Sequence, residues 1–168
     1  DWIDHYRDVI GDSQNLDKRG SKRSLQPPGT YWEYNDVRVN RLSLALMHAF
    51  GRPLPEILKE RIMDPIGASE TWEWHGYDNS WLNINGQRLQ SVSGGAHWGG
   101  GLWINSLDHA LVGQLMLNKG QWNGVEIISE KWVNESTSLA QGVDNYGLHW
   151  WIFPENNLIG ALGLHTND

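Results

Sequence analysis

The chain contains no cysteine, which excludes disulfide bonds, thiolate metal sites and a cysteine nucleophile within its 168 residues. No apolar run approaches the ~18 residues that a membrane-spanning helix needs, so the sequence predicts no membrane span. Cations are few: 13 Lys and Arg stand against 20 Asp and Glu, giving a formal net charge of −7. This balance argues against a nucleic-acid-binding protein, which needs clustered cations for its phosphate contacts.

Complete catalytic motifs are missing as well. There is no Gly-x-Ser-x-Gly, Ser-x-x-Lys, P-loop or His-Glu-x-x-His motif. The seven His are scattered without an i, i+4 pair, and the glycine-rich stretch 94–101 lacks dinucleotide-binding spacing, so we expect neither metal nor cofactor. The chain begins at Asp1 without a signal segment and stops directly after an apolar stretch, which leads us to expect a fragment of a longer protein.

Apolar periodicity predicts two helices in the first half of the chain. Asn35 or Asp36 is a suitable N-cap for the first helix, and Gly51 suits its C-terminal end. The second helix follows at Pro55 and is expected to stop at Pro65 and Gly67. The apolar stripe expected on the first helix is Val39, Leu42, Leu46, Ala49 and Phe50, and the buried face expected on the second is Ile57, Leu58, Ile62 and Met63.

The second half mixes strands and helices. Asn85-Gly86 predicts a type I′ hairpin turn between 80–84 and 87–92, and Asn123-Gly124 predicts a second tight turn. Two further helices are expected, one capped by Ser106 with Leu107, Leu111 and Leu115 as its inner stripe, the other capped by Ser129. Residues 146–153 and 158–162 are strand-like. The order of elements predicts an α+β fold in one domain, 1–168, with 1–26 as a loop-rich lead-in.

Three local constellations are candidates for chemistry. Tyr34 stands just before a helix N-terminus, where a phenolate base would be favoured, although a core or capping aromatic is the simpler interpretation. The glycine-rich stretch through Trp98 and Gly99 is either a substrate-lining loop or a tight structural turn. The stretch 160–167, with Gly163 and His165, either offers amide donors to a carboxylate or oxyanion or is a frayed terminus.

Taken in order, these segments resemble the class C β-lactamase-related serine hydrolases, a group with penicillin-binding-protein-like esterases, D-amino-acid peptidases and 6-aminohexanoate-oligomer hydrolases. Residues 28–36 resemble the Pro-Gly-x…Tyr-x-Asn segment, and 64–72 look like its Pro-Leu-Gly-Met-x-x-Thr stretch. Residues 99–110 are similar to the Gly-Gly-Leu…Ser…Asp-Leu-Ala segment, and 120–129 to the turn and helix cap that follow it. The similarity runs from about residue 27 to the C-terminus. Within the group, residues 32–36 and the Trp-rich middle of the chain look more like the esterase-type branch than a dedicated β-lactamase.

The resemblance implies a β-lactamase/transpeptidase-like fold, with an antiparallel sheet flanked by helices plus a helical lobe. It also implies a Ser-x-x-Lys nucleophile upstream of this chain that attacks a small ester or amide substrate and forms an acyl-enzyme. Tyr34 would be the family tyrosine, and Asp36 falls where the family has Asn. The third family motif would be 161–163, an Ala-x-Gly version that includes Gly163, or 165–167, which supplies the His165 imidazole; the register stays open.

Two other interpretations of the function remain open. The 11 Trp would suit a non-catalytic carbohydrate-binding module in which exposed indoles serve as stacking platforms. A homologue without a nucleophile, used as a scaffold or receptor, is the third possibility. The presence or absence of Ser-x-x-Lys in the upstream sequence separates that scaffold from the enzyme.

Overall fold

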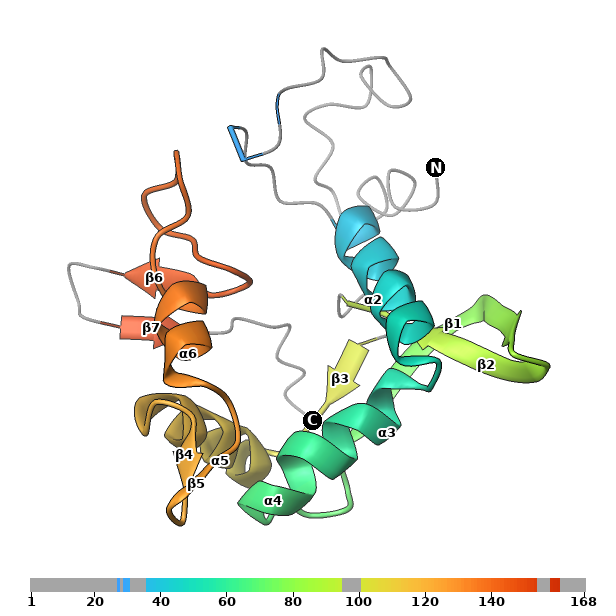
Figure 1. Cartoon of the computed structure of the whole chain (residues 1–168), viewed down its shortest axis with the longest axis horizontal. Helices are drawn as coiled ribbons and strands as arrows, with labels where there is room; N and C mark the ends of the chain where they lie inside the picture. Colours follow the sequence, from blue (N-terminus) through green and yellow to red (C-terminus); the bar gives the residue numbers. More distant parts are fainter. Residues whose placement is uncertain (1–26, 28, 31–35, 95–100, 154–157, 161–168) are drawn as a thin grey trace.

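The structure of the chain is a computed structural model that describes residues 27, 29–30, 36–94, 101–153 and 158–160. Figure 1 shows helices and antiparallel sheets following one another along this part of the chain, which confirms the predicted α+β class. In the ranges described, no helix is long and apolar enough to span a membrane. The division into a lead-in and a family-like region stays a prediction.

Helix α2 (Asp36–Phe50) has the predicted length, but it turns a different face inward. Gly51 ends it with a φ of 64°, and its N–H donates to the Met47 carbonyl at 2.9 Å. Met47 and Ser43 are the buried residues. Ser43 tolerates burial because its hydroxyl donates to a backbone carbonyl one turn earlier in the helix. The predicted stripe is wrong, since three of its large members are exposed: Leu42, Leu46 and Phe50.

A second helical segment combines three pieces, α3 (Leu54–Leu58), a π-helical turn η2 (Lys59–Met63) and α4 (Asp64–Ile66). It continues through Pro65 instead of stopping there, because the π turn shifts the hydrogen-bond pattern before the proline. The Asp64 N–H donates to the carbonyl of Lys59, five residues back. Gly67 then ends the segment in the left-handed conformation, with a φ of 75°.

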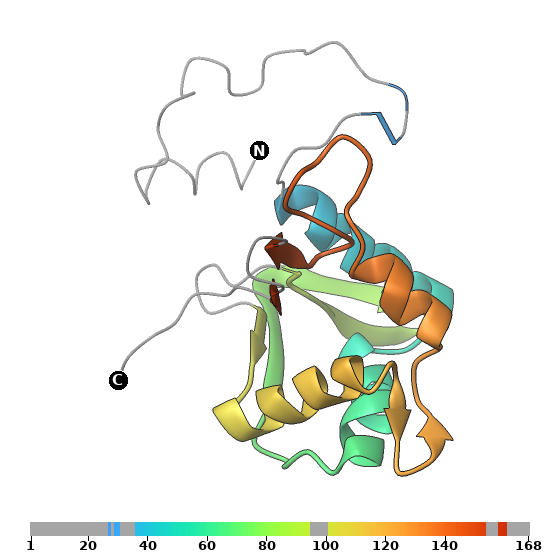
Figure 2. The ribbon, with the colours of Figure 1, turned by 90° about the vertical axis from the view of Figure 1, so that its left-hand side faces the viewer.

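The central sheet has the strand order β2-β1-β3, with β1 (Glu73–Ile84), β2 (Gln87–Val92) and β3 (Gly101–Trp103) all antiparallel. Asn85 and Gly86 both have positive φ, 52° and 81°, which confirms the type I′ turn. Figure 2 shows α2 above the β1–β2 hairpin and α5 (Ser106–Leu117) below it. The core between α2, α3 and the hairpin is formed by Met47, Leu54, Ile84 and Val92.

A second core cluster joins α4 and α5 and centres on Leu115, which is fully buried. The predicted inner stripe of α5 is partly wrong, because Leu107 is 80% exposed. The cap also differs by one residue. The Asn105 side chain, rather than that of Ser106, accepts the Asp108 N–H at 2.9 Å. In the first turn of α5, the buried side chain is therefore that of Asp108.

The remaining elements follow the expected order. Strands β4 (Gln121–Trp122) and β5 (Val125–Glu126) flank the second predicted tight turn. Helix α6 (Glu130–Ser136) is capped by Ser129, as predicted. The last two predicted strands do pair, as β6 (Trp151–Phe153) and β7 (Leu158–Gly160), but β6 is shorter than expected.

Candidate functional site

The candidate site residues lie in or beside segments that border the described parts of the chain. Asp36 is the first residue of α2, and its side chain lies outside what the structure describes. The others lie outside the described residues: Tyr34, Trp98, Gly99, Gly163 and His165. The geometry around the site therefore comes from the residues next to these segments, namely the first turns of α2, the two flanks of 95–100, and the end of β7.

The first turns of α2 contact the beginning of the glycine-rich segment. The Asn40 Oδ1 accepts the backbone N–H of Gly94 at 2.8 Å and the hydroxyl of Ser93 at 3.2 Å. A Cβ on Gly94 would overlap Cγ1 of Val39, so a residue with a side chain does not fit at 94 without a shift. The structure thus brings together the helix that follows Tyr34 and the segment that leads to Trp98.

Both flanks of residues 95–100 attach to the same residue of the central strand. On one side, the Ser93 N–H donates to the His75 carbonyl at 3.0 Å. On the other side, Gly101 is the register partner of His75 in the β1–β3 pair. The two ends of the segment are therefore fixed on opposite edges of β1, and the residues between them connect β2 to β3.

The C-terminal candidate segment begins elsewhere. Gly160 ends β7, which pairs with β6, and Figure 1 draws this hairpin well away from α2. The described residues therefore place the helix that follows Tyr34 in contact with the start of the glycine-rich segment, and place Gly160, the one described residue of the third segment, apart from that contact.

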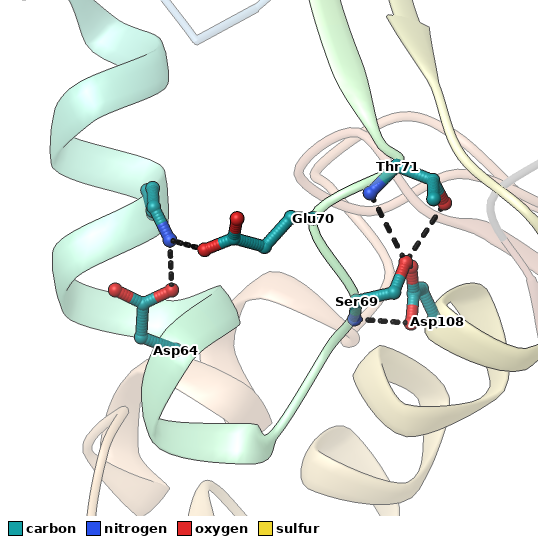
Figure 3. Close-up of polar contacts among 6 residues, drawn as sticks. Asp64, Ser69, Glu70, Thr71 and Asp108 are labelled. Atoms are coloured by element: carbon teal, nitrogen blue, oxygen red, sulfur yellow. Dashed lines mark hydrogen bonds and ion pairs between the residues drawn. The ribbon is translucent and has the colours of Figure 1, made fainter.

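A polar network that the sequence analysis missed lies at the start of α5. Asp108 is 3% exposed, and its carboxylate accepts the Ser69 N–H at 2.8 Å and the Ser69 hydroxyl at 2.6 Å. The Asn105 amide donates to the same carboxylate at 2.7 Å and to the Thr71 hydroxyl at 3.0 Å. Figure 3 shows the loop carrying Ser69 and Thr71 against the first turn of α5. Two segments that carry the resemblance, 64–72 and 99–110, meet in this network.

These hydrogen bonds favour the ionised carboxylate. The side-chain bond from Ser69 lowers the pKa of Asp108 most, followed by the Ser69 backbone N–H, and Asn105 adds to them, while burial acts in the opposite direction. The only sequence signal for this network is the presence of short polar side chains in both segments. From the local sequence, Asp108 is expected only to interact favourably with the dipole of its own helix. Its partner Ser69 cannot be recognised there, because it is 39 residues away in the sequence.

An exposed ion-pair group lies next to this network. The Lys59 ammonium contacts Asp64 at 2.6 Å and Glu70 at 3.2 Å. Figure 3 shows these two carboxylates beside the loop that carries Ser69. Both carboxylates raise the pKa of Lys59 through hydrogen bonds, that of Asp64 first. Because all three side chains are exposed to solvent, these ion pairs link η2 to α4 and to the loop at Glu70 but add little to the stability of the fold.

The central strand carries a half-exposed histidine at the point where the glycine-rich segment attaches. His75 Nε2 lies 2.7 Å from Glu73 Oε2, and the imidazole makes an edge-to-face contact with Trp103 at a centroid distance of 5.6 Å. In the part of the chain that the structure describes, no group of three or more His, Asp or Glu residues is arranged to hold a metal ion. Among these residues, His75 is therefore paired with Glu73 alone of the possible carboxylate ligands.

The comparisons with known proteins point to a distant relative. No family model matches the chain. A protein of Escherichia coli O157:H7 named "Putative D-alanyl-D-alanine carboxypeptidase" is 24% identical over 152 residues, an alignment that covers 73% of this chain. The chain spans 35% of the length of that relative. The relative's name places it among the penicillin-binding-protein and β-lactamase-like serine hydrolases, the group that the ordered motifs resemble.

Proposed function

We propose that this chain is part of a serine hydrolase that cleaves ester or amide bonds through an acyl-enzyme. The observation that carries the proposal is an agreement between the motif order and the distant relative. The family-like segments occur in the order expected of these hydrolases, and the relative is named as a carboxypeptidase, a hydrolase of peptide bonds. The chain contains no Ser-x-x-Lys, so in this proposal the nucleophile belongs to residues outside it.

In the proposed mechanism, the serine hydroxyl attacks the substrate carbonyl while its proton passes to the Tyr34–Lys pair. The tetrahedral intermediate collapses, the leaving group takes up that proton, and the acyl-enzyme remains. Water then attacks the ester of the acyl-enzyme and releases the acid. A tyrosine base needs its pKa lowered from ~10, and a nearby Lys of the nucleophile segment would supply the cation that does so.

The substrate contacts assigned in this proposal come from three segments. Asp36 follows Tyr34 at the start of α2, and an ionised carboxylate there accepts hydrogen bonds where the family's Asn also donates them. This difference disfavours recognition of a β-lactam amide. Trp98 and Gly99 would line the acyl group, and Gly163 or His165 would contact the carboxylate or oxyanion side.

The test is hydrolysis of p-nitrophenyl acetate by the complete gene product and by its Tyr34→Phe variant. We expect the variant to lose ~10²–10⁴-fold in kcat, the usual contribution of an acid–base group. Tyr146→Phe is the matched control, because it removes a phenol hydroxyl outside the proposed site and keeps the ring that contacts Trp151 edge-to-face at 5.0 Å. Turnover of the Tyr34 variant at the wild-type rate would remove Tyr34 from the mechanism.

A second candidate function has its own observation. Trp103 and Trp132 are 58% and 52% exposed, so these indoles are accessible for a carbohydrate to stack on, whereas the Arg88 guanidinium lies over the Trp81 ring at 5.0 Å. Titration of the tryptophan fluorescence with soluble glucans tests this hypothesis. Saturable quenching that disappears in Trp103→Ala would support a carbohydrate-binding module, whereas an unchanged spectrum with every sugar would count against it.

A further inference from the structure

We propose that Asn40 is a positioning residue of the hydrolase site, an inference that rests on the proposed function. Its two hydrogen bonds, to the Gly94 backbone and the Ser93 side chain, form what we call the Asn40 bridge and fix the glycine-rich segment relative to α2. In this proposal, the bridge sets where the chain that leads to Trp98 and Gly99 leaves the central sheet relative to the helix that follows Tyr34 in the sequence. Asn40 itself touches no reacting atom in this proposal.

The bridge joins parts of the chain that are far apart in the sequence. Ser93 and Asn40 are 53 residues apart, and Gly94 and Asn40 are 54 apart. Asn40 lies one helical turn after Asp36, about 6 Å along the helix axis. The N-terminal end of α2 is the end that follows Tyr34 in the sequence, and Asn40 comes six residues after that proposed base.

The partner side of the bridge is held firmly. Ser93 is 2% exposed, and its carbonyl accepts the indole N–H of Trp74 at 2.7 Å. Its hydroxyl lies 3.0 Å from Tyr77 Oη, and its N–H is bonded to the His75 carbonyl. Ser93, the residue after β2, is therefore attached to β1 by these hydrogen bonds, and the Asn40 bridge links α2 to this attachment point.

The close approach of the two backbones supports the same conclusion. Gly94 leaves no space for a Cβ beside Val39, so the chain passes directly over the helix at the point where the bridge forms. A single oxygen, Asn40 Oδ1, accepts both hydrogens and uses both of its lone pairs. Replacing that oxygen by an apolar group would leave the Gly94 amide and the Ser93 hydroxyl without this acceptor, and the glycine-rich segment would shift.

The experiment compares Asn40→Leu and Asn40→Asp in the complete gene product with p-nitrophenyl acetate as substrate. Leu keeps the approximate size and removes the acceptor, whereas Asp keeps the acceptor oxygen. Because a misplacement of ~1 Å can reduce a rate ~100-fold, we expect Asn40→Leu to lose ~100-fold in kcat, and Asn40→Asp to recover most of it.

Asn105→Ala is the matched control for stability. Asn105 is also an asparagine that makes a backbone and a side-chain hydrogen bond, but it lies at α5, away from the bridge. At a temperature where all variants are folded, Asn105→Ala should retain wild-type kcat. An equal loss of kcat in Asn105→Ala and Asn40→Leu, or no loss in Asn40→Leu, would overturn the positioning role.

Hydrogen exchange separates this inference from the proposed function. The Gly94 amide should be protected in the wild type and in Asn40→Asp, and should exchange faster in Asn40→Leu. If the wild-type protein hydrolyses no ester or amide, the proposed function fails, and the positioning role fails with it even where the exchange pattern holds. If the wild type is active and Gly94 exchanges equally fast in all variants, the Asn40 bridge itself is refuted.

Discussion

Leu115 and Leu107 lie on the same helix, and the structure predicts opposite results when each is shortened to alanine. Leu115 is 0% exposed and packs in the cluster with Met63 and Ile66, whereas Leu107 is 80% exposed in the first turn of α5. Leu115→Ala removes three carbons from a site surrounded by side chains on every side. Such deletions cost about 2–5 kcal/mol, from lost burial and from the cavity left behind.

The neighbours of Leu115 decide where in this range the loss in stability of the Leu115→Ala variant should fall. The buried cluster joins Leu115 to Met63 of η2 and Ile66 of α4, and the backbones of these segments are fixed by helical hydrogen bonds. Since the site has little freedom to collapse, we expect a loss of about 3 kcal/mol or more in the free energy of unfolding. Leu107→Ala loses almost no burial and exchanges one good helix former for another, so its effect should stay within about 0.5 kcal/mol.

Urea unfolding of the 168-residue chain, followed by far-ultraviolet circular dichroism, measures both variants under identical conditions. At unchanged m-value, the Leu115→Ala midpoint should fall clearly and the Leu107→Ala midpoint should hardly move. In thermal unfolding, about 3 kcal/mol corresponds to roughly 6–12 °C for a chain of this size. Equal losses at the two positions would refute the orientation of α5, and with it the second core.

Three further substitutions should change stability in different directions. The lowered pKa of Asp108 means that its stabilisation is present above the unfolded-state pKa and is lost as the pH falls through the lower folded-state pKa; Asp108→Asn should flatten the acid limb of a stability–pH curve. Gly94→Ala should destabilise the chain by overlap with Val39, seen as a lower melting temperature. Gly113→Ala, in the middle of α5 with no atom within 4 Å of the place that its methyl group would take, should instead stabilise by about 0.5–1 kcal/mol in urea unfolding.

Turns and helix ends are the features that the sequence predicts best, because they depend on one or two residues. Asn85-Gly86 and Asn123-Gly124 both adopt the positive φ values that their type of turn requires. Gly51 and Gly67 end their helices in the left-handed conformation for the same local reason. None of these features needs information about distant parts of the chain.

Helix orientation is predicted less well, because leucines occupy more than one face. In α2, Leu42 and Leu46 form a plausible stripe, yet the face that packs on the sheet is the one with Ser43 and Met47. The choice depends on which face meets the β1–β2 hairpin, which is a tertiary contact. The network around Asp108 escapes local patterns for a similar reason, since its burial depends on a loop 39 residues away.

The candidate site is a prediction made as a set of segments, and the structure describes only the residues that flank them. The contact of Asn40 with Gly94 places the helix after Tyr34 beside the glycine-rich segment, a relation that no local pattern contains. The individual roles of Tyr34, Asp36 and His165 stay predictions. Their chemistry depends on groups that approach from other parts of the protein, above all the expected lysine.

The π-helical turn before Pro65 has a consequence for how this chain tolerates insertions and deletions. A π turn contains one residue more than an α turn, and here it lets the helix continue into a proline that lacks an N–H to donate. Because the π turn holds this extra residue, deleting one residue between 59 and 63 would convert it to an α turn and keep the residues after it in nearly the same phase. Ile66 would then still face the second core while Leu54 stayed in the first, and the cost would fall on Pro65, whose ring clashes with the carbonyl four residues back in a regular α-helix.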